Sequence, residues 1–228
     1  MNTSRKIAII VGALFLIAMV TSLVGGGLLE SILDAPDYLI NVSANTTPVF
    51  IGIFLELVNG IAVVGIGVMM FTILKQHSES IALGYVGFRI IESVFLTVAA
   101  ILPLSLIALS QEYVKAGASD DSYFQTLGTL LIAARADVAG LLIPVFFSLG
   151  ALLFYYLLYR SKLIPRFISV WGLIGVALIL ALNLLDISFG IGMLLALPII
   201  SNEIFLGIWL IVKGFNPSAI ASGSAKQT

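Results

Sequence analysis

Residues 81–109 read IALGYVGFRIIESVFLTVAAILPLSLIAL, and this stretch decides the fold class. A helix needs about 20 mostly apolar residues to cross the hydrocarbon core of a bilayer, and this stretch exceeds that length. It nevertheless contains Arg89 and Glu92, and a charge at the centre of a membrane helix costs about 2.5–3.5 kcal/mol on insertion scales. The stretch therefore predicts a membrane-spanning helix whose two charges turn away from lipid.

The rest of the chain has the same character. Of its 228 residues, 60% are hydrophobic and only 10% are charged, and the mean hydropathy is +1.16. A soluble domain has about 25% charged residues, so this composition predicts an integral membrane protein surrounded by membrane lipid, without a sizeable soluble domain. The formal net charge of −1 provides no field that would attract nucleic acid, and we expect no nucleic-acid partner.

Six apolar segments are long enough to span a bilayer. The first follows Arg5 and Lys6, which also suits a signal peptide. Its apolar run is longer than the roughly 7–15 residues of such a peptide, and no A-x-A-like cleavage site follows, so we expect a retained helix. Residues 123–159 are too long for one straight span, and residues 123–134 are interpreted as an interfacial lead-in turn of helix. The predicted spans are residues 7–29, 48–74, 81–109, 136–159, 167–188 and 195–212.

Placement of Lys and Arg predicts the orientation, because these residues are enriched in cytoplasmic loops. With both termini inside, the inner side holds Arg5, Lys6, Lys75, Arg160, Lys162, Arg166, Lys213 and Lys226, whereas the outer loops hold only Lys115. Aromatic residues near the inner ends of the spans fit an interfacial belt: Tyr155, Tyr156, Tyr159 and Trp171. The sequence therefore predicts an all-α integral membrane protein, a six-transmembrane-helix bundle with both termini cytoplasmic.

The chain is expected to form one domain. Residues 1–215 contain all six predicted spans and the short loops between them, so we expect a single six-span membrane domain. Residues 216–228 are rich in Ser, Ala and Gly, and we expect a disordered cytoplasmic tail there. The oligomeric state is left open.

The residue types available limit the chemistry. The chain has no cysteine, which excludes disulfides, thiolate nucleophiles and Cys-ligated metals. The only histidine, His77, lies in a polar loop, which excludes a two-His metal site from a single chain. Any metal would need oxygen ligands, and we predict neither a cofactor nor a metal site. Because G-x-S-x-G, H-E-x-x-H and Walker-type motifs are missing too, an enzymatic activity is left open and its catalytic residues unknown.

Four charged residues lie inside the predicted spans, away from the span ends that hold Asp137 and Asp186: Glu56, Arg89, Glu92 and Glu203. Counted at 1.5 Å per residue from the inner ends of their helices, Arg89, Glu92 and Glu203 lie about 13–18 Å deep, near the middle of the membrane. Arg89 and Glu92 share a helix face with Tyr85. Arginine has five donors and stays charged, so we expect Arg89 to bridge Glu92 and Glu203. One negative charge then remains for a proton, a cation or a cationic ligand group.

A second group of polar residues is predicted nearer the outer surface. Glu56 and Asn59 share one helix face, Asp137 lies at a similar depth, and Asn202 precedes Glu203. Each of the three outside-to-inside helices carries a carboxylate followed by glycine, which leaves a gap for a ligand or a partner helix: Glu56 and Gly60, Asp137 and Gly140, Glu203 and Gly207. We expect a polar cavity that opens outward and narrows towards Arg89. Arg135 and Asp137 near the interface have the competing interpretation of simple hydration.

Three short stretches resemble a known family. They are Gly87-Phe88-Arg89-Ile90-Ile91-Glu92; Pro165-Arg166-Phe167-Ile168-Ser169-Val170-Trp171-Gly172; and Asn202-Glu203-Ile204-Phe205-Leu206-Gly207, followed by Trp209 and Lys213-Gly214-Phe215. Together they resemble the bacterial membrane family called domain of unknown function 4386, over about residues 5–215. The resemblance implies a six-span protein of the bacterial cytoplasmic (inner) membrane. It implies no activity and no catalytic residues.

Three functional hypotheses follow. The leading one is binding or translocation of a small polar or cationic ligand or a proton, with Arg89, Glu92 and Glu203 as the deep site; protonation of one carboxylate would couple occupancy to helix rearrangement. The second is a membrane-embedded enzyme acting on lipid or a lipid-linked substrate, with a glutamate as general base or Mg²⁺ ligand. The third is a non-catalytic sensor or partner subunit whose buried charges only fix helix packing. A dry, fully paired site would favour the third.

Overall fold

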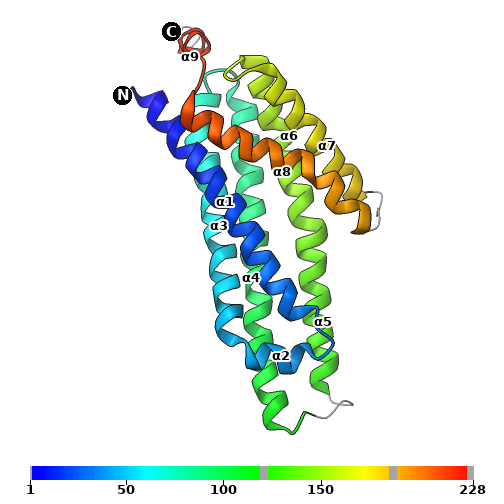
Figure 1. Cartoon of the computed structure of the whole chain (residues 1–228). Helices are drawn as coiled ribbons and strands as arrows, with labels where there is room; N and C mark the ends of the chain where they lie inside the picture. The colour runs from blue at the N-terminus through cyan, green and yellow to red at the C-terminus, as the bar shows by residue number, and fades with distance from the viewer. Residues whose placement is uncertain (1, 119–122, 185–188, 225–228) are drawn as a thin grey trace.

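The computed structural model describes residues 2–118, 123–184 and 189–224. In this part of the chain every regular element is a helix (Figure 1). The elements are α1 (Thr3–Leu33), α2 (Tyr38–Ala44), α3 (Thr46–Leu74), α4 (Glu79–Lys115), α5 (Tyr123–Asp137), the π-helical turn η1 (Val138–Leu142), α6 (Ile143–Ser161), α7 (Arg166–Leu184), α8 (Phe189–Val212) and α9 (Pro217–Ser224).

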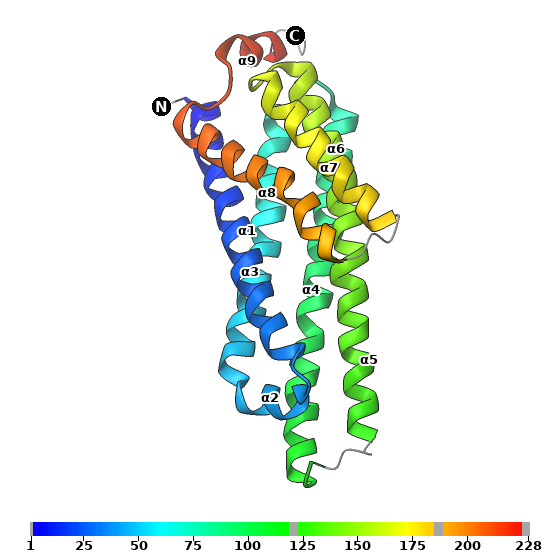
Figure 2. The same ribbon diagram turned by 45° about the vertical axis from the view of Figure 1, so that its right-hand side comes forward.

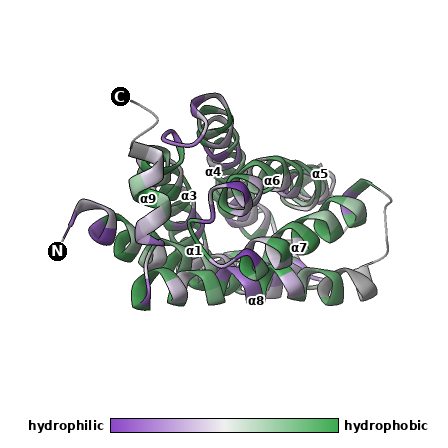
Figure 3. Cartoon of the chain, turned by 90° about the horizontal axis from the view of Figure 1, so that it is seen from above, coloured by the Kyte–Doolittle hydropathy of each residue, from purple (hydrophilic) through white to green (hydrophobic). Residues whose placement is uncertain are grey.

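Six of the described helices are long and apolar enough to cross a membrane, which confirms the predicted all-α, six-span class. These are α1, α3, α4, the continuous run from α5 through η1 to α6, α7, and residues 194–212 of α8. The outer surface suits lipid, because large apolar side chains such as Phe54, Ile61 and Leu130 are more than 60% exposed. Seen along the bundle, the outward sides of the helices are largely hydrophobic (Figure 3).

The six spans form a ring in which each helix packs against two neighbours. Helix α1 contacts α3 and α8, α4 contacts α3 and α6, and α7 contacts α6 and α8. Both ends of the chain lie at the same end of the bundle, here called the termini end (Figures 1 and 2). Helices α7 and α8 run obliquely and cover only the half of the bundle nearest the termini (Figure 2). Helix α8 crosses α1 near the termini and diverges from it towards the middle of the bundle.

The other half of the bundle is longer than a bilayer requires. Helix α4 has 37 residues, about 55 Å at 1.5 Å per residue, against a hydrocarbon core of about 30 Å. Its far end packs with α2 and α5, and a second apolar core around Leu29, Leu39, Leu106 and Tyr113 holds this region together. We call this region, made of α2, α5 and the adjoining ends of α1, α3 and α4, the far lobe. The end of the predicted span 167–188, residues 185–188, and the last residues of the predicted tail, 225–228, lie outside the described residues.

Two segments differ from their predictions. The predicted lead-in turn at residues 123–134 is a longer helix, α5, and the five-residue turn η1 joins it to α6 without interrupting the helix from Tyr123 to Ser161. The tail is not disordered over residues 217–224, where α9 forms. Ala219 of α9 is 6% exposed and joins the apolar core at the termini end, with Ile220 packed against it. Tertiary packing of a few apolar residues therefore overrides a composition typical of disorder.

Candidate functional site

A charged trio lies in the interior of the ring. Arg89 and Glu92 come from successive turns of α4, and Glu203 comes from α8 on the opposite wall. One guanidinium nitrogen of Arg89 lies 2.8 Å from a carboxylate oxygen of Glu92, and another lies 4.0 Å from a carboxylate oxygen of Glu203. The side chains are 4%, 6% and 15% exposed, in the order Arg89, Glu92, Glu203. The predicted position of Arg89 between two carboxylates is therefore confirmed, and a ligand-binding role stays a prediction.

Aromatic side chains hold the guanidinium of Arg89 in place. Its Nε donates to the hydroxyl of Tyr85 one turn earlier on α4, at 3.3 Å. The guanidinium carbon also lies 5.4 Å from the ring centroid of Phe147 and 5.6 Å from that of Tyr85. Cation–π contacts of this kind stabilise a desolvated cation. Arg89 is therefore pre-positioned by uncharged neighbours as well as by the carboxylates.

Glu203 is the member of the trio with the weakest pairing. Its 4.0 Å separation from Arg89 is too long for a hydrogen bond, and no hydrogen bond to its carboxylate occurs among the described residues. Glu92, in contrast, accepts a charge-assisted hydrogen bond of 2.8 Å. Arg89 can balance only one carboxylate, so when both carboxylates are ionised the trio has one excess negative charge, and Glu203 is the group best placed to carry it.

The trio borders a cavity of about 280 Å³ enclosed by α1, α3, α4, α6, α7 and α8. We call it the interior cavity. Its polar lining is Ser22, Asn59, Arg89, Glu92 and Glu203, and its apolar lining includes Phe15, Met19, Val63, Ile66, Leu96, Pro144, Phe147, Ile179 and Ile199. Of the residues that line the cavity, Ser22 and Leu23 of α1 are exposed. The cavity is therefore a mostly apolar chamber with the charged trio in its wall and with lining residues on α1 that reach the outer surface.

A second buried ion pair joins the far lobe to the ring. Arg135 of α5 lies 2.5 Å from Glu56 of α3, donates from both terminal nitrogens to the two oxygens of that carboxylate, and donates to the carbonyl oxygen of Ala99 on α4 at 2.7 Å. Arg135 is only 7% exposed, so its interpretation as a hydrated interfacial residue is wrong. The expected grouping of Glu56 with Asp137 is also wrong, because Asp137 is exposed.

The remaining predicted residues are divided between interior positions. Asn59 is buried and lines the interior cavity with Arg89 instead of an outer mouth beside Glu56. Asn202 is fully buried, and its Nδ2 donates to the carbonyl oxygen of Ile168 on α7 at 2.9 Å. Gly60 and Gly207 are covered by partner helices: the hydroxyl of Ser93 donates to the carbonyl oxygen of Gly60, and Gly207 lies against Gly12 of α1. The two glycines that follow a carboxylate, Gly60 and Gly207, therefore serve close helix packing.

The sequence did not predict the buried, unpartnered state of several polar side chains. Tyr155, expected in the interfacial belt, is 1% exposed, and its hydroxyl has no hydrogen-bond partner among the described residues. It lies within electrostatic reach of Glu203 and Arg89. The Ser169 hydroxyl and Asn202 Oδ1 are likewise buried without a partner in the described part of the chain. No local pattern distinguishes Tyr155 from the exposed Tyr156 beside it, because only the close approach of Gly172 on α7 makes room for its ring.

The described residues contain no group of three or more His, Cys, Asp or Glu side chains that could hold a metal ion.

A protein-family model described as Domain of unknown function (DUF4386) matches residues 10–214 of the chain. No curated protein and no solved structure matches it. The match covers all six spans and both buried ion-pair sites.

Proposed function

The chain is a multi-pass membrane protein that belongs to the DUF4386 family, and we propose that it binds a small organic cation with an apolar body in the interior cavity. The observation that carries this proposal is the incompletely paired carboxylate of Glu203, which borders a cavity otherwise lined mainly by apolar side chains. In this proposal the protein lies in the bacterial cytoplasmic membrane.

The charges of the side chains that line the cavity determine whether a ligand should be a cation or an anion. Glu92 and Glu203 face a single cation, Arg89, and none of the other described residues that line the cavity is charged. A buried carboxylate without a counter-charge is costly, so a cation beside Glu203 would remove that cost. An anion would be repelled by the carboxylates of Glu92 and Glu203, and the guanidinium of Arg89 already donates to Glu92 and Tyr85.

The volume and the apolar lining of the cavity determine the size and the polarity of the rest of the ligand. A volume of about 280 Å³ is at the lower end for small-molecule sites, which favours a compact ligand. Apolar side chains such as Phe15, Val63 and Ile199 would contact its body, while Asn59 offers a neutral hydrogen-bonding group near the charged end. Because exposed residues of α1 line the cavity, we expect a ligand that dissolves in the bilayer to reach it from the side.

The other two hypotheses receive less support. A purely structural role for the buried charges favours a dry and fully paired site, whereas the trio borders a cavity and Glu203 has no hydrogen bond among the described residues. The enzyme hypothesis depends on Glu92 or Glu203 as the general base, because none of the described residues that line the cavity is a histidine or a cysteine. No specific observation therefore favours an enzyme.

Movement of a proton is a second candidate, and the unpartnered polar atoms favour it. Tyr155 and Ser169 lie about 9 and about 5 Å from the termini-end limits of their helices, and Arg89 lies about 15 Å from that of α4. Buried polar atoms without a protein partner are usual positions for ordered water. Waters at Tyr155, Asn202 and Ser169 would form a hydrogen-bonded path from Glu203 to the termini end.

Thermal unfolding of the purified protein tests the binding proposal. Butyl-, hexyl- and octylammonium are added, together with the uncharged alcohols of the same chain lengths. We expect an alkylammonium ion to raise the midpoint temperature by several degrees at saturating concentration, because a ligand that binds only the folded state stabilises it. In Glu203→Gln the same ion should bind at least ten-fold more weakly, since the attracting charge is gone.

Glu112→Gln is the matched control, because Glu112 is 62% exposed on its side chain and paired only with Lys115 in the far lobe. It should respond like the wild type. Equal stabilisation by alcohol and ammonium, or an unchanged response in Glu203→Gln, would contradict the proposal. The same proteins in liposomes with an enclosed pH dye test the second candidate: Tyr155→Phe should slow proton movement, and a rate equal to wild type would rule out the water path.

A further inference from the structure

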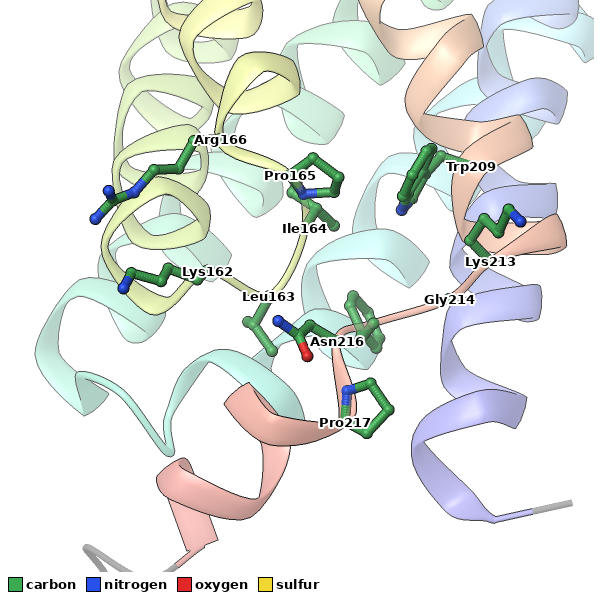
Figure 4. A pocket seen from close by; sticks show the side chains of 11 residues that line it. Lys162, Leu163, Ile164, Pro165, Arg166, Trp209, Lys213, Gly214, Asn216 and Pro217 are labelled. Carbon is green, nitrogen blue, oxygen red and sulfur yellow. The ribbon is translucent and has the colours of Figure 1, made fainter.

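A second pocket lies at the termini end, outside the interior cavity. It has a volume of about 560 Å³ and lies between the loop joining α6 to α7 and the loop joining α8 to α9 (Figure 4). Its walls are residues 162–166 and 213–217 together with Trp209. We call it the basic pocket, because its charged lining residues, Lys162, Arg166 and Lys213, are all cations.

The three cations flank the pocket on two sides. Lys162 and Arg166 lie on one side and Lys213 on the other, with Trp209, Asn216 and Pro217 between them, and the charged ends of the three side chains point away from the pocket (Figure 4). All three basic residues are exposed, and the guanidinium of Arg166 lies 4.9 Å from the ring centroid of Tyr159. Rotation of these exposed side chains would bring up to three positive charges to the pocket, and none of the described residues that line it is a carboxylate.

The two loops are held in a defined arrangement. The backbone N–H of Asn216 donates to the carbonyl oxygen of Leu163 at 2.8 Å, which ties the loops together at the base of the pocket. Leu163 and Phe215 beside this bond are buried. From the neighbouring helix α1, the guanidinium of Arg5 donates to the carbonyl oxygens of Leu210, Ile211 and Val212, which caps the end of α8 next to Lys213. The pocket is thus preformed, which lowers the cost of binding.

An aromatic strip leads from the basic pocket along the seam between α7 and α8. Trp209, in the pocket wall, stacks on Phe205 with ring centroids 6.2 Å apart. Phe205 also contacts Phe167 at 6.0 Å and Trp171 at 5.8 Å. Phe167 is 56% and Phe205 37% exposed on the lipid side of the bundle. The strip offers an apolar surface that is continuous with the basic pocket.

We propose that the basic pocket binds the headgroup of an anionic phospholipid, with the glycerol and the start of an acyl chain against the aromatic strip. Three features support a lipid over a free anion. The pocket lies where α6, α7 and α8 end, which is the level of lipid phosphates. Basic pockets between helix ends at this level bind anionic headgroups. An ion without acyl chains would make no contact with the aromatic strip.

The test compares phosphatidylglycerol with phosphatidylcholine of identical acyl chains, added to the purified protein in neutral detergent. Native mass spectrometry measures the bound lipid, and thermal unfolding measures the stabilisation. The wild type should bind phosphatidylglycerol about 10-fold or more tightly than phosphatidylcholine. In the triple variant K162Q/R166Q/K213Q this preference should fall to about two-fold or less, because each basic residue near the surface contributes roughly five-fold to the attraction.

The matched control is K6Q/K75Q/R160Q, which removes three exposed cations from the same end without touching the basic pocket. It should keep the wild-type preference, and equal losses in the two triple variants would overturn the proposal. Trp209→Leu should weaken both lipids while leaving their ratio unchanged. Inorganic phosphate and glycerol 3-phosphate should give no comparable stabilisation; if either reproduces the effect of phosphatidylglycerol, the pocket is a free-anion site and the lipid assignment is wrong.

Discussion

At the scale of single residues, the two buried ion-pair sites differ in how completely their charges are paired. Arg135 and Glu56 use both carboxylate oxygens, and Ala99 accepts a further hydrogen bond from Arg135. Glu203, in contrast, is 4.0 Å from Arg89 and faces the interior cavity. A fully paired site serves to join elements, whereas an unpaired charge beside a cavity is available to a ligand. The two arginines are therefore assigned different roles.

Substitution of Arg135 should strongly destabilise the protein. Arg135→Gln leaves Glu56 as an unpaired buried charge, and removal of one partner of a buried pair costs about 3–5 kcal/mol. The double variant Arg135→Gln with Glu56→Gln removes that charge and should recover part of the loss. Unfolding of the purified variants in denaturing detergent measures both. If the double variant is as unstable as the sum of the two single variants, Arg135 and Glu56 do not act as a pair.

At the scale of helices, the ring closes where α1 and α8 cross. A Cβ atom at Gly12 would lie 2.5 Å from the carbonyl oxygen of Gly207 and 2.8 Å from Cγ1 of Ile211, closer than real atoms approach. Small residues at such crossings let helix backbones approach in lipid, where packing replaces the hydrophobic effect between helices. The same two helices line the interior cavity, so we expect their separation to affect access to Glu203.

Gly12→Ala should therefore force α1 and α8 apart. The overpacking is expected to cost about 1–3 kcal/mol of unfolding free energy, and it should also change the affinity for alkylammonium, because the two helices line the cavity. Gly87→Ala is the control, since nothing lies within 4 Å of a Cβ added there. Alanine is a better helix former than glycine by about 1 kcal/mol, so this control should be neutral or slightly stabilising. Equal effects of the two substitutions would show that the crossing is not tightly packed.

At the scale of the whole molecule, the bundle has two unlike ends. The termini end carries α9, the basic pocket and most of the Lys and Arg residues, whereas the far lobe extends α4 and α5 beyond the length needed to cross the hydrocarbon core. Both termini lie at one end, as six crossings require (Figure 1). The positive-inside rule predicts that this end faces the cytoplasm and that the far lobe lies outside.

Cysteine labelling tests this orientation directly, because the chain has no cysteine of its own. Ala44 lies at the end of α2 in the far lobe and Ala221 on α9, and both are exposed. In intact bacterial spheroplasts, a membrane-impermeant maleimide should label Ala44→Cys at once and Ala221→Cys only after lysis. The reverse pattern would place the basic pocket in the outer leaflet and would show that the bundle is inverted relative to the prediction.

Local features of the sequence determined the membrane class, the number of spans and the depth of the deep charges. Each of these depends on the length of an apolar run and on a rise of about 1.5 Å per residue, which no neighbouring helix can change. Arg89 and Glu92 were predictable as neighbours because they are three positions apart on one helix. Glu203 was predictable beside them, because few buried charges were available at that depth to balance Arg89.

Tertiary structure alone decided which helix faces met. The partner of Arg135 is 79 positions away, and the pairing depends on how α5 is rotated against α3, which a single sequence does not encode locally. Tyr155 is interior only because Gly172 makes room for it, and α9 forms only because Ala219 has an apolar core to join. The basic pocket likewise brings together loops some fifty residues apart through one hydrogen bond between Asn216 and Leu163. The rotation of each helix and its contacts with its neighbours are properties of the packed bundle. They distinguish the carboxylate of Glu203, which borders the interior cavity, from that of Glu56, which joins two helices.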